Sequence, residues 1–453
     1  EILAIAIQPD GRIVAVGSSS SSAGQRFAVA RYNADGTLDS TFDTDGKVLI
    51  GLPGRGGEAT AVALSAVGGA LKIVVAGTAF AGAGGTDEDV AVVRYNAADG
   101  SLDPTFNGTG QVVVLNFGHP EFPASIVIQP DGKIVVGGSV LDLAAGDFNF
   151  LLVRFEDTGE LDVAFGAPGG GGYHNGGQVT TDFSGAFTPP ILADDVLGGI
   201  TIQPDGKIVA GGFTEDLDSG AATFTLARYE TDGTLDQTFG VGGLVNTSEG
   251  WGAALVLRSD TKILLGGLGR WSRDFTLAQY GADGSLDATF GTGGIVATNL
   301  GGFDAIHALA LQADQKIVAA GTTAGIAGTR LAVARYLGGD TTPPTIDHAT
   351  VTPSVLWPPN HKFVPVTVDV LATDDGLPVP CAIAGIYSSE PVTGPNDDTT
   401  PDWRITGPVT ASLRAERSNA ASGRTYRIAV ECVDGAGNVA TAEVLVSVSH
   451  RRP

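Results

Sequence analysis

The stretch from Ile200 to Thr247 reads ITIQPDGKIVAGGFTEDLDSGAATFTLARYETDGTLDQTFGVGGLVNT. Two apolar runs flank the Pro-Asp-Gly at 204–206, and Asp-Gly between apolar runs is a strong signal of a β-hairpin. FTLARYE predicts a third strand, which the Thr-Asp-Gly at 231–233 turns back, and LVNT after the glycines at 242–243 predicts a fourth. We therefore expect a small antiparallel sheet whose four strands follow sequence order.

The same pattern recurs along the chain in six copies. A basic residue opens the second strand of each copy, at Arg12, Lys72, Lys133, Lys207, Lys262 and Lys316. The motif Leu-Asp-x-x-Phe follows the third strand in five copies, with Asp39 and Phe42, Asp103 and Phe106, Asp162 and Phe165, Asp236 and Phe239, and Asp287 and Phe290. The sixth copy ends before this motif. A repeat of this length is typical of a β-propeller, whose sheets bury their faces only against neighbouring sheets.

The pattern IQPDGKIV followed by ARYxxDGxLDxxFGxGG resembles the delta-sixty repeat family of bacterial surface and secreted proteins, over roughly residues 1 to 340. The resemblance implies a β-propeller in a surface or secreted setting and carries no catalytic residue over. A solenoid is the alternative, but a β-helix needs about one short strand per turn, so four strands in each copy suit it less well. We expect an all-β chain with a six-bladed β-propeller over residues 1–339.

The repeat stops at the Gly-Gly-Asp-Thr-Thr-Pro-Pro of 338–344, which we interpret as a linker. Residues 340–453 contain about seven short runs such as TYRIAVECV, the pattern of an immunoglobulin-like β-sandwich. LWPPNHKFVPVTV, DTTPDWRITG, SLRAERS and CVDGAGN also resemble a C-terminal immunoglobulin-like module of bacterial secreted proteins, related to hyalin-repeat modules. That resemblance implies a surface or secreted context and an adhesive or spacer role.

The net charge of −24 at pH 7 makes the chain strongly acidic. Such a field repels nucleic acid and anionic membranes, so we expect neither as a partner. No run approaches the roughly 20 apolar residues of a membrane helix, so we expect no membrane insertion. The chain begins inside a predicted strand without Met. From this we expect an extracellular or cell-surface protein whose signal peptide has been removed.

Cys381 and Cys432 are the only cysteines in the sequence. An even pair in a secreted-type module is normally a disulfide, so we expect the two to be bonded. The same module has a cluster of loop residues with oxygen ligands of the kind that calcium prefers, at Asn396, Asp397, Asp398 and Asp402. Solvated loop acids are the alternative that we favour. No cofactor is required in this interpretation, and calcium is the ion that the cluster suits.

An arginine recurs in the third strand, at Arg31, Arg94, Arg154, Arg228 and Arg335. Because the Arg and Asp pair recurs in nearly every copy, we interpret it as structural: a charge-assisted bond between the third strand and the next turn, with the Phe plugged between sheets. Gln279 replaces the arginine in copy five, where we expect Asp287 to be solvated. We expect His307, the one ionisable group within such an inner strand, to be structural.

Residues that the copies do not share are the better candidates for ligand contacts, because shared residues answer to packing. Copies five and six carry such aromatic and acidic side chains, at Trp251, Trp271, Phe303, Glu249 and Asp304. Aromatic faces stack on the apolar faces of sugar rings, while carboxylates accept hydrogen bonds from hydroxyl groups. We expect a carbohydrate or polymer site on one rim, with packing between sheets as the alternative.

The sequence shows no nucleophile elbow, no zinc-type histidine spacing and no Cys/His pair. We therefore expect a non-catalytic binding or adhesion protein, whose partner is an extracellular glycan, polymer or protein surface. One alternative is a self-associating subunit of an appendage, coat or matrix. The other is a propeller enzyme, a lyase or hydrolase, with an unrecognised site. We also expect Ile2–Gln8 to lie beside copy six and close the ring, which leaves one three-stranded sheet.

Overall fold

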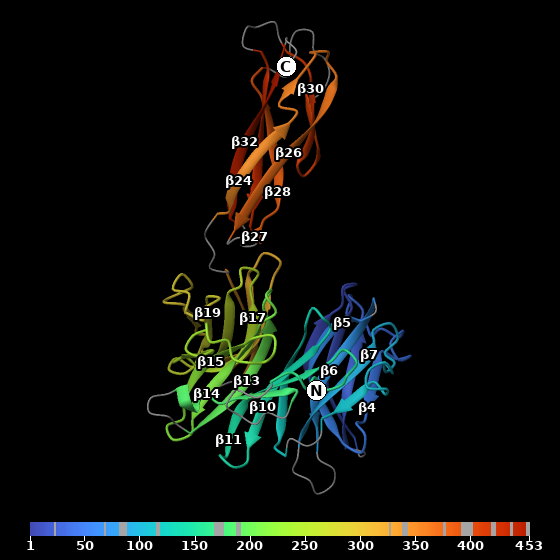
Figure 1. Cartoon of the computed structure of the whole chain (residues 1–453), viewed down its shortest axis with the longest axis vertical. Coiled ribbons are helices and arrows are strands. Elements are labelled where there is room, and N and C mark those ends of the chain that lie inside the picture. The colour runs from blue at the N-terminus through green and yellow to red at the C-terminus, as the bar shows by residue number, and fades with distance from the viewer. Residues whose placement is uncertain are drawn as a thin grey trace. The chain divides into compact units, whose positions relative to one another are not determined.

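The computed structural model describes residues 1–21, 24–67, 69–80, 88–114, 118–166, 176–186, 192–325, 328–337, 343–374, 377–390, 402–417, 423–434 and 438–449. The chain divides into two compact units, residues 1–310 with 318–334 and residues 311–317 with 335–453. Both units are built from β-strands, drawn as arrows in Figure 1. One short 3-10 helix lies at Ser184–Ala186. Within the described ranges, no helix has the length and apolar character needed to cross a membrane.

Each copy of the repeat forms its own antiparallel sheet, with strands in sequence order. Sheet one holds β1 (Ile2–Ile7), β2 (Ile13–Ser21), β3 (Gly24–Tyr32) and β4 (Lys47–Ile50). Sheet two holds β5 (Gly57–Val67), β6 (Ala70–Ala79), β7 (Asp89–Asn96) and β8 (Gln111–Val113). Sheet three holds β9 (Glu121–Ile128), β10 (Ile134–Asp142), β11 (Asp147–Phe155) and β12 (Gln178–Thr181).

The remaining copies continue this series. Sheet four holds β13 (Ala193–Ile202), β14 (Ile208–Asp216), β15 (Ala221–Tyr229) and β16 (Leu244–Thr247). Sheet five holds β17 (Gly250–Leu257), β18 (Ile263–Gly269), β19 (Phe275–Tyr280) and β20 (Ile295–Thr298). Sheet six has the three strands β21 (Phe303–Leu311), β22 (Ile317–Gly325) and β23 (Gly328–Tyr336). The predicted four-stranded order is therefore confirmed in five copies, and the predicted three-stranded sheet in the sixth.

The turn between β13 and β14 shows how the sequence builds these sheets. Ile202 pairs with Ile208 across the turn. The amide of Gly206 donates to the carbonyl of Gln203 at 2.9 Å, and the amide of Gln203 donates to the carbonyl of Lys207 at 2.9 Å. Gly206 has a φ of 88°, which glycine adopts without steric cost. The Asp-Gly pair thus forms the hairpin that its sequence predicts.

Apolar side chains gather between successive sheets. Each core cluster draws its residues from two neighbouring copies, with Phe27 and Tyr95 between sheets one and two, Val92 and Phe155 between two and three, Phe150 and Tyr229 between three and four, and Phe224 and Tyr280 between four and five. A single sheet therefore cannot bury its own apolar side chains, and stability depends on stacking.

Sheet six leaves one face open. Leu331 and Val333 of β23 are 91% and 70% exposed, whereas Phe224 and Leu226 in the same places of β15 are fully buried. Ile7 of β1 is also 66% exposed. The predicted closure, with Ile2–Gln8 packed on copy six, is therefore not formed as a buried interface.

The second unit contains two sheets that share one core. The five-stranded sheet combines β24 (Thr345–Thr352), β26 (Phe363–Asp374), β27 (Leu377–Pro378), β29 (Trp403–Gly407) and β30 (Thr410–Arg414). The four-stranded sheet combines β25 (Val355–Leu356), β28 (Cys381–Ser388), β31 (Thr425–Val433) and β32 (Val439–Val448). Together with the repeat sheets, they confirm that the described chain is all-β.

A disulfide joins β28 to β31. Cys381 and Cys432 face each other directly in the register of the two strands, with their Cα atoms 4.0 Å apart. The predicted bond is confirmed. A disulfide is compatible with an oxidising, secreted setting.

Candidate functional site

The unshared residues of copies five and six meet around one loop, residues 270–274, which joins β18 to β19. The amide of Arg270 donates to the carbonyl of Glu249 at 2.6 Å, in the turn before β17. The amide of Asp304 in β21 donates to the carbonyl of Arg273 at 2.9 Å. The loop therefore connects the start of the first strand of sheet five with that of sheet six.

Two arginine–aromatic pairs cover the loop. The guanidinium of Arg270 lies 4.5 Å from the centre of the Trp271 ring, and that of Arg273 lies 4.3 Å from the centre of the Phe303 ring. Trp271 is 80% exposed and Phe303 is 47% exposed. Arg273 has a φ of 57°, in the left-handed region that is sparsely populated outside glycine and clusters at functional sites. The loop thus presents aromatic and cationic groups to solvent.

Trp251 bonds to a carboxyl group of the neighbouring sheet at this edge. Its indole N–H donates to Oε2 of Glu215 at 3.1 Å, and Glu215 belongs to β14 of the neighbouring sheet. Glu249 precedes Trp251 by two positions, and burial raises the pKa of Glu249. A carboxyl group with a raised pKa keeps its proton to higher pH and can act as a general acid. The edge therefore combines a half-buried tryptophan, the carboxylate that accepts its hydrogen bond, and a second carboxyl group two positions away in the sequence.

Asp304 does not face a ligand. It is fully buried, and its Oδ2 accepts a hydrogen bond from the amide of Leu300 at 2.6 Å. Asp195 does the same in sheet four, where its Oδ2 accepts from the amide of Phe183 at 2.7 Å. We expected Asp304 to bond to ligand hydroxyl groups. Its burial makes it part of the scaffold that holds the segment between two sheets.

A buried acid near the start of the first strand is a recurring feature that sequence reasoning missed. Glu121, Asp195 and Asp304 are all 0% exposed. Each lies eight positions before the glutamine that opens the first hairpin turn, at Gln129, Gln203 and Gln312. The constant spacing between acid and glutamine could have revealed this feature in the sequence, although the residues between them differ from copy to copy. Burial raises the pKa of Asp195 to about 8, against the opposing hydrogen bonds from Phe183 and Thr214.

The repeated Arg and Asp form the expected structural bond. Arg228 Nε lies 2.7 Å from Oδ2 of Asp236, and Lys207 Nζ lies 2.7 Å from the same oxygen. The guanidinium carbon of Arg228 lies 4.5 Å from the centre of the Phe239 ring. The same arrangement occurs in other copies, with Arg31, Asp39 and Phe42, Arg94, Asp103 and Phe106, and Arg154, Asp162 and Phe165.

These bonds hold the carboxylates in their charged form. Burial opposes ionisation of Asp103, but hydrogen bonds from Thr105 and Lys72 and the charge of Arg94 outweigh it and lower its pKa to about 2. The charged carboxylates therefore hold the strands and the following turn of their own copy together.

Copy five exchanges two members of this network. In copy four, Arg228 Nη1 donates to Oε1 of Gln203 at 3.4 Å. In copy five, Arg258 takes the place of the glutamine, and its Nη1 donates to Oε1 of Gln279 at 3.4 Å. Gln279 Nε2 in turn donates to Oδ2 of Asp287 at 2.7 Å. The expectation of a solvated Asp287 is wrong, because this amide holds a side chain that is only 12% exposed.

A cavity of about 630 Å³ is lined by the first strands of all six repeat sheets. Its wall is mainly apolar, with residues such as Ile5, Val62, Ile126, Leu255 and Leu309. Among the described residues of this wall, His307 is the one ionisable side chain, and its Nε2 lies 3.1 Å from Oγ1 of Thr322. The cavity therefore offers fewer polar groups to a ligand than the rim around residues 270–274.

The expected calcium cluster is only partly visible. Asn396, Asp397 and Asp398 lie outside the described residues. Asp402 is fully buried, and its carboxylate accepts a hydrogen bond from the guanidinium of Arg424. In the described part of the chain, no group of three or more His, Cys, Asp or Glu side chains is placed to hold a metal ion.

Comparison with solved structures overturns one expectation. The chain is similar to the polysaccharide lyase Uly1, at 10% identity and a TM-score of 0.41, over 99% of this chain and 90% of that one. It is similar to a GH43_1 enzyme from Xanthomonas citri, at 12% and 0.31, over 61% and 87%. It is also similar to a mutant Trypanosoma rangeli sialidase displaying trans-sialidase activity, at 12% and 0.37, over 75% and 55%.

These similar structures carry the names of enzymes, which contradicts the expectation that this chain is not one. The missing motifs were weak grounds, because catalytic groups on loops follow geometry and need no fixed sequence pattern. Likeness at these scores identifies no substrate or reaction for this chain.

Sequence comparison agrees with the repeat pattern. No curated protein matches the chain. A family model described as "Domain of unknown function (DUF5122) beta-propeller" matches residues 8–42, 72–106, 129–165, 203–239 and 258–290. These segments run from the first hairpin to the end of Leu-Asp-x-x-Phe in copies one to five. Five of the repeats thus match a family model of β-propeller repeats.

Proposed function

We propose that this chain is a polysaccharide-active hydrolase whose substrate lies on the rim around residues 270–274. The observation that carries the proposal is the hydrogen bond from Trp251 to Glu215, beside Glu249, which lies two positions before Trp251 and has a raised pKa. Most glycoside hydrolases use two carboxyl groups, one that protonates the leaving oxygen and one that acts as nucleophile or base. Glu249 is our candidate for the acid and Glu215 for its partner.

The neighbouring loop supplies the features of a sugar-binding surface. Trp271 is the most exposed aromatic ring of the rim, and Phe303 lies at its other side. Such rings stack on the apolar faces of sugars. Arg270 and Arg273 add cationic donors to a strongly acidic chain. Arginine pairs well with planar carboxylates, so the rim suits polysaccharides that contain acidic sugars as well as neutral ones.

We also propose the finer architecture and location. The six repeat sheets are the blades of one propeller, supported by the single cavity that their first strands line. The second unit is an immunoglobulin-like sandwich, supported by its two sheets and shared core. The disulfide between Cys381 and Cys432 supports a location outside the cell, where a polysaccharide would be the partner.

The test is a screen of neutral and uronate-containing polysaccharides with the full chain. Release of reducing ends reports cleavage of the glycosidic bond, and absorbance of an unsaturated product distinguishes a lyase reaction from hydrolysis. Glu249→Gln should abolish release of reducing ends while leaving polysaccharide binding within about twofold, because it removes the proton and keeps the shape. Trp271→Ala should weaken binding by roughly tenfold, since stacking contributes on the order of 1 kcal/mol or more.

Two controls separate the outcomes. Trp357→Ala removes another exposed tryptophan, 44% exposed and far from the rim in the sequence, and should change neither readout. Full activity of Glu249→Gln would rule out the assigned acid. Unsaturated product without loss of activity in that variant would replace the hydrolase by a lyase, and no effect of Trp271→Ala would place the substrate elsewhere.

A further inference from the structure

The Leu-Asp-x-x-Phe segment performs two tasks in copy four. It first completes its own sheet: the amide of Asp236 donates to the carbonyl of Arg228 at 2.9 Å, and β16 pairs with β15. It then reaches the next copy. A Cβ at Gly284 of copy five would lie 2.9 Å from the ring of Phe239, so this glycine forms a socket for the ring.

The same contacts repeat along the series. Each phenylalanine plug approaches the turn glycine of the following copy to within about 3 Å of a Cβ placed there, with Phe42 at Gly100, Phe106 at Gly159 and Phe165 at Gly233. The residue after the plug donates its amide to the aspartate carbonyl of the same turn, at Asp43 and Asp99, Asn107 and Thr158, Gly166 and Asp232, and Gly240 and Asp283. Copy three uses Thr158 in place of the aspartate.

In sheet six, β23 is the edge strand, and no described strand pairs with it as β16 pairs with β15. Leu331–Ala334 occupy the place of Phe224–Ala227, which β16 covers in copy four. Leu331 is 91% exposed and Val333 is 70% exposed. Arg335 follows in the same strand and is exposed, and no described residue forms an ion pair with it. An edge strand with apolar side chains and unpaired backbone groups is a template for another strand.

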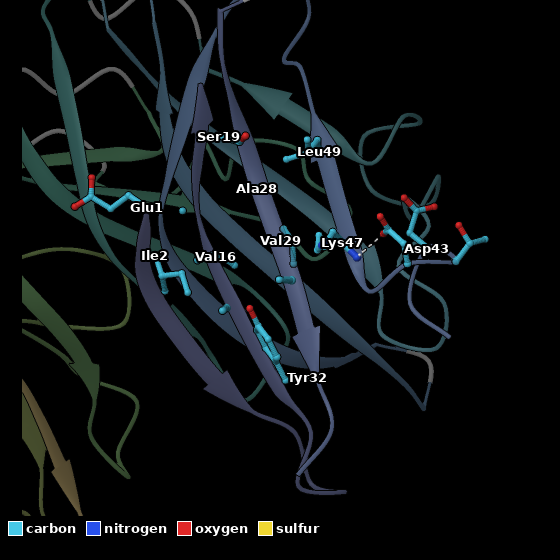
Figure 2. A pocket seen from close by; sticks show the side chains of 15 residues that line it. Glu1, Ile2, Val16, Ser19, Ala28, Val29, Tyr32, Asp43, Lys47 and Leu49 are labelled. Carbon is cyan, nitrogen blue, oxygen red and sulfur yellow. Dashed lines mark hydrogen bonds between the residues drawn. The ribbon is translucent and has the colours of Figure 1, made fainter. Parts of the chain in front are cut away.

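Sheet one has the turn glycine, Gly36, that corresponds to the other sockets, but no phenylalanine of the described chain fills it. Gly36 corresponds to Gly100 and Gly284, yet among the described residues nothing lies within 4 Å of a Cβ placed on it. One face of sheet one carries Tyr32, Lys47 and Leu49. These side chains line part of a hollow of about 630 Å³ (Figure 2). Tyr32 is only half-buried, whereas the equivalent tyrosines of copies two and four are fully buried.

We propose that β23 and this face of sheet one form an acceptor site for an extended peptide that carries Leu-Asp-x-x-Phe followed by a short β-strand. The strand of the peptide pairs with Leu331–Ala334, its aspartate meets Arg335, and its phenylalanine fills the space over Gly36. Addition of a strand to a sheet edge is a common mode of peptide recognition, in which main-chain bonds give affinity and side chains give specificity. The partner is therefore a protein segment with the chemistry of this repeat's own fourth strand.

The experiment uses a labelled peptide with the sequence of residues 285–298, SLDATFGTGGIVAT. Titration into the full chain should show saturable binding by fluorescence anisotropy, and hydrogen exchange should show new protection at Leu331–Ala334. Arg335→Glu should weaken binding at least about tenfold, because it places two like charges together. A peptide with Asp287→Lys should bind the Arg335→Glu chain better than the wild-type peptide does, which tests the pairing of the two charges directly.

Matched variants guard against non-specific binding. Arg330→Glu reverses another exposed charge of β23, outside the stretch that a fourth strand covers, and should leave the affinity unchanged. A peptide with Phe290→Ala should bind roughly tenfold more weakly, since buried aromatic anchors dominate such interfaces. The proposal is overturned if no saturation occurs at millimolar peptide. It is equally overturned if Arg335→Glu has no effect, or if protection appears only on other strands.

Discussion

The two compact units secure their strands in different ways. In the first, an Arg–Asp–Lys group recurs within successive copies of the repeat, as in Arg228, Asp236 and Lys207. In the second, one disulfide joins Cys381 to Cys432, and the buried carboxylate of Asp402 accepts a hydrogen bond from Arg424. A repeat can form the same Arg–Asp bond in each of several copies, so each of these copies contributes to the stability. The second unit has one core shared by two sheets and relies on bonds that occur once.

The largest expected effect comes from breaking one repeated ion group. Asp236→Ala leaves Arg228 and Lys207 without their shared counter-charge, and loss of one partner of a buried pair costs about 3–5 kcal/mol. Urea unfolding of the full chain should show this loss in the transition of the first unit. Asp218→Ala, an exposed aspartate of the same copy, serves as the control and should change stability by less than about 0.5 kcal/mol. A loss of under 1 kcal/mol for Asp236→Ala would mean that the group is not structural.

The second unit should respond most to removal of its disulfide. Cys381 and Cys432 are separated by 51 positions, and closing a loop of that length contributes about 4 kcal/mol in the chain-entropy model. Cys381→Ser with Cys432→Ser should lower the calorimetric transition of the second unit and leave that of the first unchanged. A shift of both transitions would show that the units unfold together, against the division described above.

Asp195 should make the first unit less stable as pH rises. Its pKa is about 8 in the folded chain and 3.8 in the reference state, so folding favours the protonated form. The stabilisation is complete below about pH 4 and is lost as pH rises towards 8, at no more than about 1.4 kcal/mol per pH unit. Asp195→Asn should flatten this slope in denaturant unfolding between pH 5 and pH 7. Equal slopes in both proteins would contradict the raised pKa.

The smallest effect is expected where copy five differs from copy four. The double variant Arg258→Gln with Gln279→Arg restores the arrangement of copy four and should change stability by less than about 1 kcal/mol. Each single change should cost more, about 2 kcal/mol, because it leaves either two cations or two amides together. Chemical denaturation of the three variants measures the coupling. Additive single effects would show that the two positions do not interact.

Much of the fold could be read from local sequence. Asp-Gly at 205–206 specifies a hairpin because glycine adopts the φ of 88° found there. The repeated Arg228 and Asp236 lie eight positions apart on either side of one turn, so their bond is also local. The pairing of Cys381 with Cys432 followed because no other cysteine exists. The site was harder to predict, and the expectation of a non-catalytic protein failed because it rested on missing motifs.

By itself, the sequence determined which residues form strands, where they turn and which bonds recur, since these depend on neighbours along the chain. Only the tertiary structure decided that Trp251 bonds to Glu215 of another sheet, that Asp304 is buried, and that the socket at Gly36 has no plug. These facts depend on which side chains meet across sheets. The tertiary arrangement decides how far each side chain is buried. Burial raises the pKa of Glu249, whereas Trp271 remains 80% exposed.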